Sequence, residues 1–437
     1  MSSSSLKGFR DFYPEDLALR NRIFDTWREV ARRYGFVEYD GPPLEPLEMY
    51  TRKSGPEIVE QLYAFEDKGG REVALRPEMT PTFARMVSDR APALPKPIRW
   101  FSVPQLFRYE QPQKGRTREH FQLNLDIVGE EGVAADAEVI AAAVDILRAF
   151  GLDADDVAAR ISSRRLAAGV LRAAGVPDGG LEDAFQALDK AERRDRDWVR
   201  EELRRAGADD GGIDRILAYT EMDLGEVREA YASDGDVTAA ADRLGRLFEL
   251  LDQYGLGEFA EFDAGLVRGL AYYTGVVFEL WDRRGDLRAI CGGGRYDDLL
   301  ASLGGRDLPA AGFGMGDVVL AELLRERGLT GEEEQGLDDF VVFISDEERP
   351  LAMRLVRALR ESGRSAAYDL EARSVGRQFG AADQAGARRT LVLGPDEVSR
   401  GVALVREMES GEEREVPLEE MMELPDGRPA AAAEPGS

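Results

Sequence analysis

Cationic side chains gather in one short stretch of the chain, FRYEQPQKGRTREH at residues 107–120. It carries Arg108, Lys114, Arg116 and Arg118. Arginine grips phosphate through paired hydrogen bonds and stabilises charge that develops on a phosphoryl group. The stretch therefore indicates a loop that binds a phosphate-bearing ligand, although a solvated hairpin would carry the same residues.

The segment that follows, FQLNLDIV at residues 121–128, alternates apolar and polar residues and predicts a β-strand. Its polar face holds Gln122, Asn124 and Asp126. A carboxylate on the floor of a sheet suits a bound ammonium group. The alternative is that this face is the solvated side of an ordinary strand.

Two other segments carry polar residues beside predicted strands. In RPEMT, Glu78 and Thr80 suit an amine and a hydroxyl-like group, or they cap a helix. In LVRGLAYYTGVVFE, Arg268 stands close to Tyr272 and Tyr273. This pattern predicts a cation in a ligand pocket with little water, or an arginine that stacks on tyrosine for structural reasons.

The run Gly292-Gly293-Gly294-Arg295-Tyr296 allows a close approach of the backbone, and we expect a turn followed by a helix. Neither GxxxxGK[ST] nor GxGxxG before a helix occurs, so the run is not a phosphate loop of those types. His120 and Cys291 are the single residues of their types. They exclude a histidine-cluster metal site and an intrachain disulfide, and we expect Cys291 to be a buried small hydrophobe.

Length and composition predict a protein of two or three domains with real cores, since the chain has 437 residues of which 43% are hydrophobic. No apolar stretch reaches membrane-spanning length, and the N-terminus MSSSSLKGFRDF lacks the apolar region of a signal peptide. We therefore expect a cytoplasmic protein without membrane contacts.

The charge balance is strongly acidic, with 57 Lys+Arg against 84 Asp+Glu and a net charge of −27. Taken alone, this argues against nucleic-acid binding, which needs basic surfaces. The acid excess is spread along the whole chain and lysine is scarce. At molar salt the Debye length falls to roughly 3 Å, so self-repulsion is screened. The composition favours an extreme halophile over an ordinary acidic protein.

The flanking elements supply the scaffold. After Pro14, apolar residues at helical spacing predict a helix that ends at Gly35, and EVALRP (72–77) and IRWFSV (98–103) predict strands. A further helix ends at Gly151. LAYYTGVVFELW at 270–281 predicts another strand, and strands alternating with helices after the polar linker 329–339 indicate a separate α/β domain.

These segments, in this order, resemble the histidyl-tRNA synthetases. KGFRDFYPED and YDGPPLEPLEMY resemble the opening and motif 1, FRYEQPQKGRTREHFQLNLDIVG resembles motif 2, and LVRGLAYYTGVVFE and GGGRYD resemble the two histidine signatures. SVGRQFGAADQAGARRTLVLGPDEV resembles the anticodon-binding domain. The resemblance extends from Lys7 to about Met422 and implies an α+β fold: a class II synthetase antiparallel sheet flanked by helices, with a helical insertion and a C-terminal α/β anticodon-binding domain.

We expect five regions on this basis. They are a first part of the catalytic core (1–163), a helical insertion (164–255), a second part of the core (256–328), the anticodon-binding domain (338–423) and a disordered tail (424–437).

The resemblance also implies residue roles. Arg108 and Arg268 neutralise the ATP phosphates, and Glu110 and Arg116 hold the adenine and the bent triphosphate. The residues that bind the ammonium and orient the carboxylate of histidine are Glu78, Thr80, Gln122 and Asp126. The residues that line the imidazole pocket are Tyr272, Tyr273 and Tyr296. Pro42 marks the interface of a homodimer.

The implied reaction is that of a histidine–tRNA ligase, which uses ATP to form histidyl-adenylate and transfers histidine to tRNA(His), with Mg2+ bound along with ATP. The segment GFGMGDVVL departs from the family's motif 3, because Val318 and Val319 stand where glutamate and arginine are usual. We expect Arg116 or Arg118 to hold the triphosphate instead. Ala271 also replaces a common aspartate.

Two alternative functions fit parts of this pattern. One is a catalytically inactive paralogue that serves as regulatory subunit of ATP phosphoribosyltransferase, a class that lacks the anticodon-binding domain. The other is a non-enzymatic module that binds RNA or a kinase. His120, in the motif 2 segment, is expected to touch the tRNA acceptor end or to be an exposed spectator.

Overall fold

The computed structural model describes residues 5–51, 59–113, 115–191, 194–268, 272–285, 287–302, 307–331, 336–371 and 373–422. The chain divides into two compact units, Met1–Gly331 and Glu332–Ser437. Each unit has its own sheet and its own hydrophobic core. The finer division of the first unit into regions remains our prediction.

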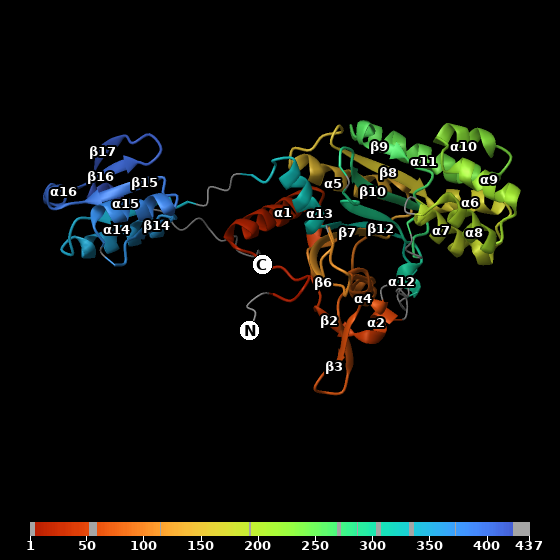
Figure 1. Cartoon of the computed structure of the whole chain (residues 1–437), viewed down its shortest axis with the longest axis horizontal. Helices are drawn as coiled ribbons and strands as arrows, with labels where there is room; N and C mark the ends of the chain where they lie inside the picture. The colour runs from red at the N-terminus through yellow and green to blue at the C-terminus, as the bar shows by residue number, and fades with distance from the viewer. Residues whose placement is uncertain are drawn as a thin grey trace. The chain divides into compact units, whose positions relative to one another are not determined.

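Within the described residues of the first unit, nine strands form one large sheet (Figure 1). In spatial order they are β1 (Val37–Glu38), β5 (Ile98–Ser102), β7 (Glu119–Val128), β12 (Ala310–Gly316), β11 (Cys291–Arg295), β10 (Val276–Asp282), β8 (Val157–Ser163) and β9 (Ala260–Phe262), while β6 (Gln105–Phe107) pairs with β7. The two outermost pairs are parallel and the others antiparallel. The predicted antiparallel sheet is confirmed.

One face of this sheet is covered by helices. They are α1 (Pro14–Arg33), α5 (Val133–Ala149) and α13 (Asp317–Glu326). Trp27 of α1 is fully buried against Leu123 and Leu125 of β7, in the larger core. Burial of such a side chain stabilises the fold by roughly 2–3 kcal/mol. The predicted first helix is therefore confirmed, and Gly35 follows it in the left-handed conformation, φ 74°.

The opposite face carries a smaller core, in which Phe83 of α4 (Thr80–Arg90) packs near Tyr273 and Tyr296. A second, smaller sheet has the strand order β2 (Leu44–Pro46), β4 (Glu72–Leu75) and β3 (Tyr63–Glu66). The short helix α2 (Leu47–Thr51) follows β2 directly in the chain.

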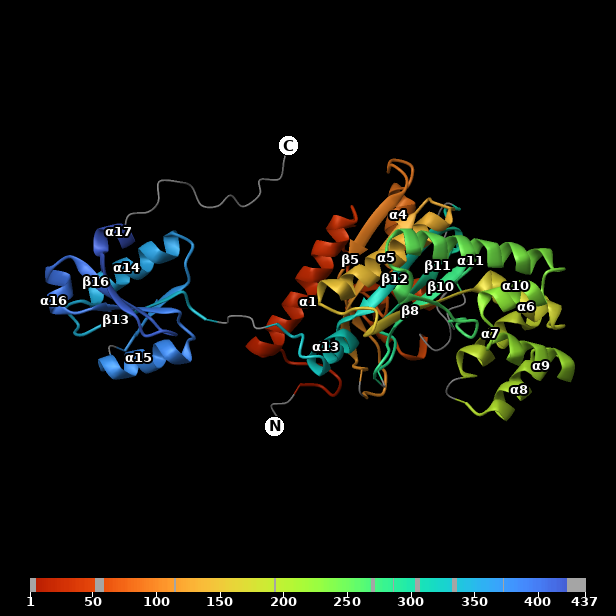
Figure 2. The same ribbon diagram turned by 90° about the horizontal axis from the view of Figure 1, so that it is seen from above.

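The predicted helical insertion is confirmed as helical. Figures 1 and 2 show its helices together at one end of the large sheet: α6 (Arg164–Ala173), α7 (Leu181–Asp189), α8 (Arg196–Arg205), α9 (Asp210–Tyr219), α10 (Leu224–Ala230) and α11 (Gly235–Gln253). Asp195, Asp209, Asp223 and Asp234 each accept a backbone hydrogen bond as the N-cap of a helix. Part of the acidic composition of this region therefore has a local structural role.

Two predictions about the second half of the core are wrong. Strand β10 begins at Val276 rather than at residue 270, and residues 269–271 lie outside the described chain. The glycine run is not a turn, because residues 291–295 form strand β11, which pairs with both β10 and β12. Because glycine has no side chain, this strand leaves space on a crowded face of the sheet. The helix that was predicted after the run is present as the short α12 (Leu299–Ser302).

The second unit confirms the predicted alternation of strands and helices. Its sheet has the order β14 (Ala366–Tyr368), β13 (Asp339–Phe343), β15 (Arg389–Leu393), β16 (Val402–Glu407) and β17 (Glu413–Pro417). Its helices are α14 (Arg349–Glu361), α15 (Val375–Gln384), α16 (Pro395–Ser399) and α17 (Leu418–Met422). The predicted tail at 424–437 lies outside the described residues, as do residues 332–335 of the predicted linker.

Candidate active site

The polar face of β7 is enclosed. Asn124 is 8% exposed and Asp126 7% exposed, on the face opposite the helix-covered Leu123 and Leu125. The alternative of a solvated strand face is therefore wrong. Burying a carboxylate costs free energy unless a partner compensates it, so the enclosure of Asp126 favours a binding function.

Glycines on the two neighbouring strands make room for this polar face. Gly312 and Gly314 of β12 lie opposite Asp126 and Asn124 of β7. A Cβ atom at Gly312 would overlap the carboxylate of Asp126, and one at Gly314 would lie 2.8 Å from Cδ of Gln122. The bare backbone of β12 is therefore the surface on which Gln122 and Asp126 rest.

The same arrangement continues on β11. Gly292 and Gly294 pair directly with Gly314 and Gly312. A Cβ atom at Gly294 would lie 2.9 Å from Cδ1 of Tyr273, and one at Gly292 would overlap the guanidinium of Arg268. The four glycines form a flat patch, which we call the glycine floor. Arg268, Tyr273, Asp126 and Gln122 each lie over one of its glycines.

The three predicted tyrosines meet at this floor. The rings of Tyr272 and Tyr273 have centroids 4.8 Å apart, and those of Tyr272 and Tyr296 have centroids 6.0 Å apart at 80°. The hydroxyl of Tyr296 donates a hydrogen bond to Oδ1 of Asp126. Burial raises the pKa of Asp126 to about 7, and the bond from Tyr296 opposes this rise only in part. Burial likewise raises the pKa of Tyr296 well above its ordinary value, so its hydroxyl stays protonated.

Arg268 reaches the floor from a strained backbone. Its φ of 50° makes it the non-glycine residue with a left-handed conformation in the described chain, at a cost of roughly 1–2 kcal/mol. Its guanidinium lies 5.7 Å from the ring centroid of Tyr273. Nη1 is bonded to Glu279, whereas Nε is buried with no hydrogen-bond partner among the described residues. A buried donor without a partner suits a ligand acceptor.

Arg108 and the motif 2 loop lie between strands β6 and β7 in the chain. Nε of Arg108 donates to the carbonyl of Pro77 at 2.9 Å. Glu110 and Arg116 form an ion pair of 2.9 Å, in which the Arg116 side chain is 43% exposed. Arg268, which is also predicted to bind ATP, lies instead beside Tyr273, so one of the predicted nucleotide-binding residues belongs to the tyrosine group.

His120 lies on the same face of β7 as Gln122 and is only partly exposed, so the expectation of an exposed spectator is wrong. Burial lowers the pKa of His120 to about 3, with further lowering by the charges of Arg108 and Arg10. The imidazole is therefore neutral near pH 7. A contact with the tRNA acceptor end stays a prediction.

Glu78 and Thr80 stand at the start of α4. Glu78 is 9% exposed, and its charge contributes, after burial and Tyr273, to raising the pKa of Tyr272. Thr80 is the first residue of α4. Glu78 is therefore close enough to the tyrosine group to act on Tyr272, and neither residue is the helix cap, because Met79 is the N-cap and makes no side-chain cap bond.

The departure in motif 3 has a structural counterpart. Asp317, at the start of α13, accepts a bond from Nη1 of Arg10 at 2.9 Å and from the backbone N–H of Phe121 at 2.9 Å. Arg10 also binds Glu119 at 2.7 Å. Val319 is buried and lies beside Gly115 of the motif 2 loop. Arg10, from the N-terminal segment, thus joins the start of α13 to the start of β7 through its ion pairs with Asp317 and Glu119.

Sequence reasoning missed the glycine floor, Glu279 and Arg164. Arg164 is buried, and its Nη1 donates to the carbonyl of Arg268 at 3.1 Å while Nη2 binds Glu182 at 2.8 Å. The alternating glycines of GFGMG were a usable signal, because glycine at every second position of a strand leaves one face bare. Nothing in the local sequence marked the other two residues.

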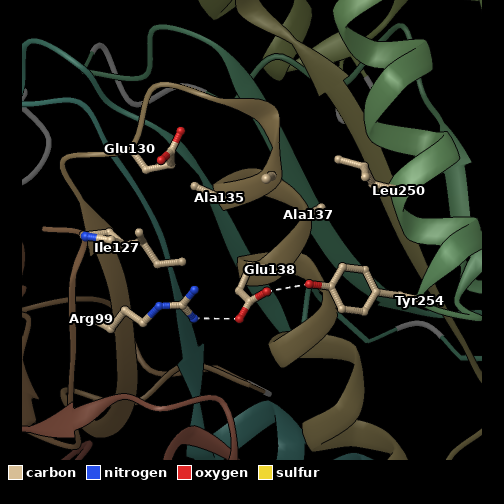
Figure 3. Close-up of a pocket in the computed structure, with 10 residues that line it drawn as sticks. Arg99, Ile127, Glu130, Ala135, Ala137, Glu138, Leu250 and Tyr254 are labelled. Carbon is tan, nitrogen blue, oxygen red and sulfur yellow. Dashed lines mark hydrogen bonds and ion pairs between the residues drawn. The ribbon is translucent and has the colours of Figure 1, made fainter.

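A small cavity of about 200 Å³ lies elsewhere, between α5 and α11 (Figure 3). In it, Glu138 accepts bonds from Arg99 at 2.6 Å and from the hydroxyl of Tyr254 at 2.5 Å. Because Glu138 is fully engaged and the lining is mostly alanine and aliphatic, the cavity carries no evident chemistry. Cys291 is buried, and burial raises its pKa well above the ordinary value, so the thiol is unreactive.

Across the described residues, no group of three or more His, Cys, Asp and Glu side chains could hold a metal ion. None of the described helices combines the length and the apolar composition that a membrane span requires.

Comparison with known proteins agrees with this geometry. A model of the histidyl-tRNA synthetase family matches residues 8–317, and a model of the anticodon binding domain matches residues 339–424. A histidine–tRNA ligase from Opitutus terrae is 46% identical over 96% of this chain and 97% of the relative. One from Haloarcula marismortui is 42% identical over 95% of each chain.

The crystal structure of histidyl-tRNA synthetase from Nostoc sp. PCC 7120 is similar with a TM-score of 0.81, at 24% identity, over 96% of this chain and 98% of that one. At this identity the likeness concerns the fold, whereas the sequence matches concern the family. Since the family model covers most of the first unit and the relatives cover nearly the whole chain, this chain belongs to the histidyl-tRNA synthetase family.

Proposed function

We propose that the side chains over the glycine floor carry the first step of the family's reaction, in which histidine and ATP form histidyl-adenylate. The observation that carries this proposal is the joint placement of Asp126, Tyr296 and Arg268 over paired glycines of β11 and β12. In this proposal, Asp126 and Tyr296 would bind the imidazole and Arg268 would bind a phosphate of ATP.

Histidine would bind with its imidazole among the three tyrosines. Asp126 and Tyr296 are polar groups in a buried setting, and they favour an imidazole because an apolar side chain could make no hydrogen bond with either of them. Glu78 would bind the ammonium group, with Thr80 and Gln122 orienting the carboxylate. This assignment places Asp126 on the imidazole side, unlike our expectation from the sequence, because its hydrogen bond joins it to the tyrosine group.

In the adenylation step, an oxygen of the histidine carboxylate attacks the α-phosphorus of ATP. The bond from that phosphorus to the bridging oxygen breaks, and pyrophosphate leaves with the electron pair. No proton is transferred, so the protein acts by alignment and by neutralising charge. Arg108 and Arg268 would approach the α-phosphate from different segments of the chain.

The rest of ATP would lie toward the motif 2 loop. Glu110 and Arg116 are proposed to hold the adenine and the bent triphosphate, and Arg116 is the exposed partner of their ion pair. Mg2+ would travel with the phosphates, because the described side chains offer no preformed metal cluster.

In the second step, the 3′ end of tRNA(His) takes the histidyl group from the adenylate and AMP leaves. The second unit would bind the anticodon. We also propose a homodimer, because Pro42 is exposed and the nearby Leu44 and Phe65 are 38% and 51% exposed. Such apolar exposure is typical of an interface.

The regulatory alternative is not favoured, because an anticodon-binding domain is present and Arg268, Tyr272 and Tyr273 are intact. We further propose a cytoplasmic enzyme adapted to high salt. Its support is the diffuse charge of −27 and the similarity to haloarchaeal relatives at 42% and 43% identity, while the Opitutus relative is 46% identical.

The decisive experiment is histidine-dependent ATP–pyrophosphate exchange in molar KCl, with the other amino acids as controls. Exchange with histidine alone is the expected result. A folded protein without exchange would contradict the proposal and make the loss of the motif 3 arginine decisive.

A further inference from the structure

The guanidinium of Arg268, which lies before β10 and outside any strand, is held by a carboxylate from β10. Nη1 of Arg268 donates to Oε1 of Glu279 at 2.7 Å, and the two side chains are 19% and 17% exposed. The other oxygen, Oε2, accepts a hydrogen bond from Nε1 of Trp281 at 3.0 Å. The two oxygens of Glu279 therefore have different donors, and Trp281 helps to fix the carboxylate.

Strand β10 delivers Glu279 to the correct face. Residues two apart on a strand point to the same side, so Val277, Glu279 and Trp281 share one face. Val277 packs in the smaller core with the tyrosines, whereas Phe278 packs in the helix-covered core. Glu279 thus lies on the face of the glycine floor.

The partner strand leaves space for the pair. Gly292 lies opposite Glu279 in the register of β10 and β11, and a Cβ atom there would overlap the guanidinium of Arg268. The backbone of Arg268 is fixed separately, by Arg164 at its carbonyl oxygen. Glu279 therefore fixes the side chain of Arg268, and Arg164 fixes its main chain.

From this geometry we infer that Glu279 is a positioning residue for adenylation, which holds the Arg268 guanidinium over the glycine floor before the substrates bind. The inference rests on the proposed role of Arg268. Glu279 takes one nitrogen and leaves Nε of Arg268 without a partner among the described residues, so a donor remains for a phosphate oxygen. Glu279 acts only through Arg268 and exchanges no proton with the substrates.

The physical reason is preorganisation. A long arginine side chain at a partly enclosed site samples several rotamers, and each excursion removes the cation from the place where phosphoryl charge develops. A carboxylate at hydrogen-bond distance selects one rotamer in advance. Its effect should therefore fall on the rate of the chemical step more than on substrate binding.

The test is a double-mutant cycle measured by histidine-dependent ATP–pyrophosphate exchange on the full-length enzyme in molar KCl. We expect Glu279→Ala to lower kcat by about 10- to 100-fold, with the KM for histidine changed by less than about threefold. Glu279→Gln should fall between this variant and the wild type, because the amide keeps one acceptor oxygen while two donors face it. Trp281→Phe should cause a smaller loss of about threefold.

The combination of Glu279→Ala with Arg268→Ala decides the mechanism. If Glu279 acts through Arg268, the double variant is no slower than Arg268→Ala alone. Multiplied losses would overturn the inference, because they would give Glu279 an independent role. Glu261→Ala removes a carboxylate that pairs with Arg283 at an exposed place and should leave the rate unchanged.

The outcomes separate this inference from the proposed function. Near-wild-type exchange in Arg268→Ala would overturn the role of Arg268 and the inference with it. Loss of exchange in Arg268→Ala together with a normal rate in Glu279→Ala would overturn the inference alone. If thermal melting shows that Glu279→Ala is unfolded, Glu279→Gln and Trp281→Phe carry the same cycle, and additive losses there would count against the inference.

Discussion

Gly312 lies directly opposite Asp126 in the register of β12 and β7, and the side chain it lacks leaves the space that the Asp126 carboxylate occupies. Asp126 is proposed to recognise the imidazole of histidine, and the position of its carboxylate thus depends on a glycine, which has no functional group. The relationship links a glycine-rich strand sequence to substrate recognition.

Gly312→Ala should therefore weaken histidine recognition. The added methyl group overlaps the Asp126 carboxylate, which must rotate away from Tyr296. We expect the KM for histidine in pyrophosphate exchange to rise by about tenfold or more, since one buried hydrogen-bonding group is displaced. Gly376→Ala, where nothing lies within 4 Å of the added carbon, is the matched control and should behave as wild type.

Asp126 also predicts a pH dependence of stability. Its pKa is raised from 3.8 to about 7 in the folded protein, so the folded state binds more protons than the unfolded state between these values. Stability of the free enzyme therefore falls as pH rises from about 4 to about 7. Asp126→Asn removes this loss and should be more stable than wild type by roughly 1–3 kcal/mol at pH 8, but not at pH 4. Denaturant unfolding at both pH values measures this, and an equal difference at both would contradict it.

Arg268→Ala should lower pyrophosphate exchange by about 10²–10³-fold, because it removes a contact to charge that forms in the transition state. Its melting temperature should stay close to that of wild type. Arg283→Ala, which breaks an exposed ion pair with Glu261, provides the arginine control. Exchange that survives in Arg268→Ala would leave Arg108 as the phosphate arginine.

The acidic surface predicts a requirement for salt. With a net charge of −27, repulsion is screened over roughly 3 Å at 1 M salt but acts over roughly 30 Å at 0.01 M. We expect the enzyme to unfold as KCl is diluted, and circular dichroism would measure this loss of structure. Full stability in dilute buffer would refute salt adaptation.

Truncation after Gly331 removes the second unit. Because the proposed adenylation residues all belong to the first unit, histidine-dependent exchange should continue, while aminoacylation of tRNA(His) should fall by about 100-fold or more. Parallel loss of both activities in a folded truncated protein would contradict the assignment of anticodon binding to that unit.

Local patterns predicted much of the fold. Helical spacing after Pro14 and the alternation of residues 121–128 both describe which side of one element is apolar, and both elements formed as expected. The strand before the second signature was placed too early, and the glycines at 292–294 were interpreted as a turn. Glycine is common in turns, so the consecutive glycines at 292–294 did not by themselves indicate a bare strand face, whereas the alternating glycines of GFGMG could have indicated one.

The sequence by itself determined the family, the order of the motifs and the polar face that carries Gln122 and Asp126, because these depend on residue type and short-range period. Only the tertiary structure decided that Asp126 meets Tyr296 and that Glu279 and Arg164 hold Arg268. Tyr296 and Arg164 come from segments more than a hundred residues away, and Glu279 reaches Arg268 only through the register of β10. Their meeting depends on strand order and register, which are set by the packing of the whole sheet.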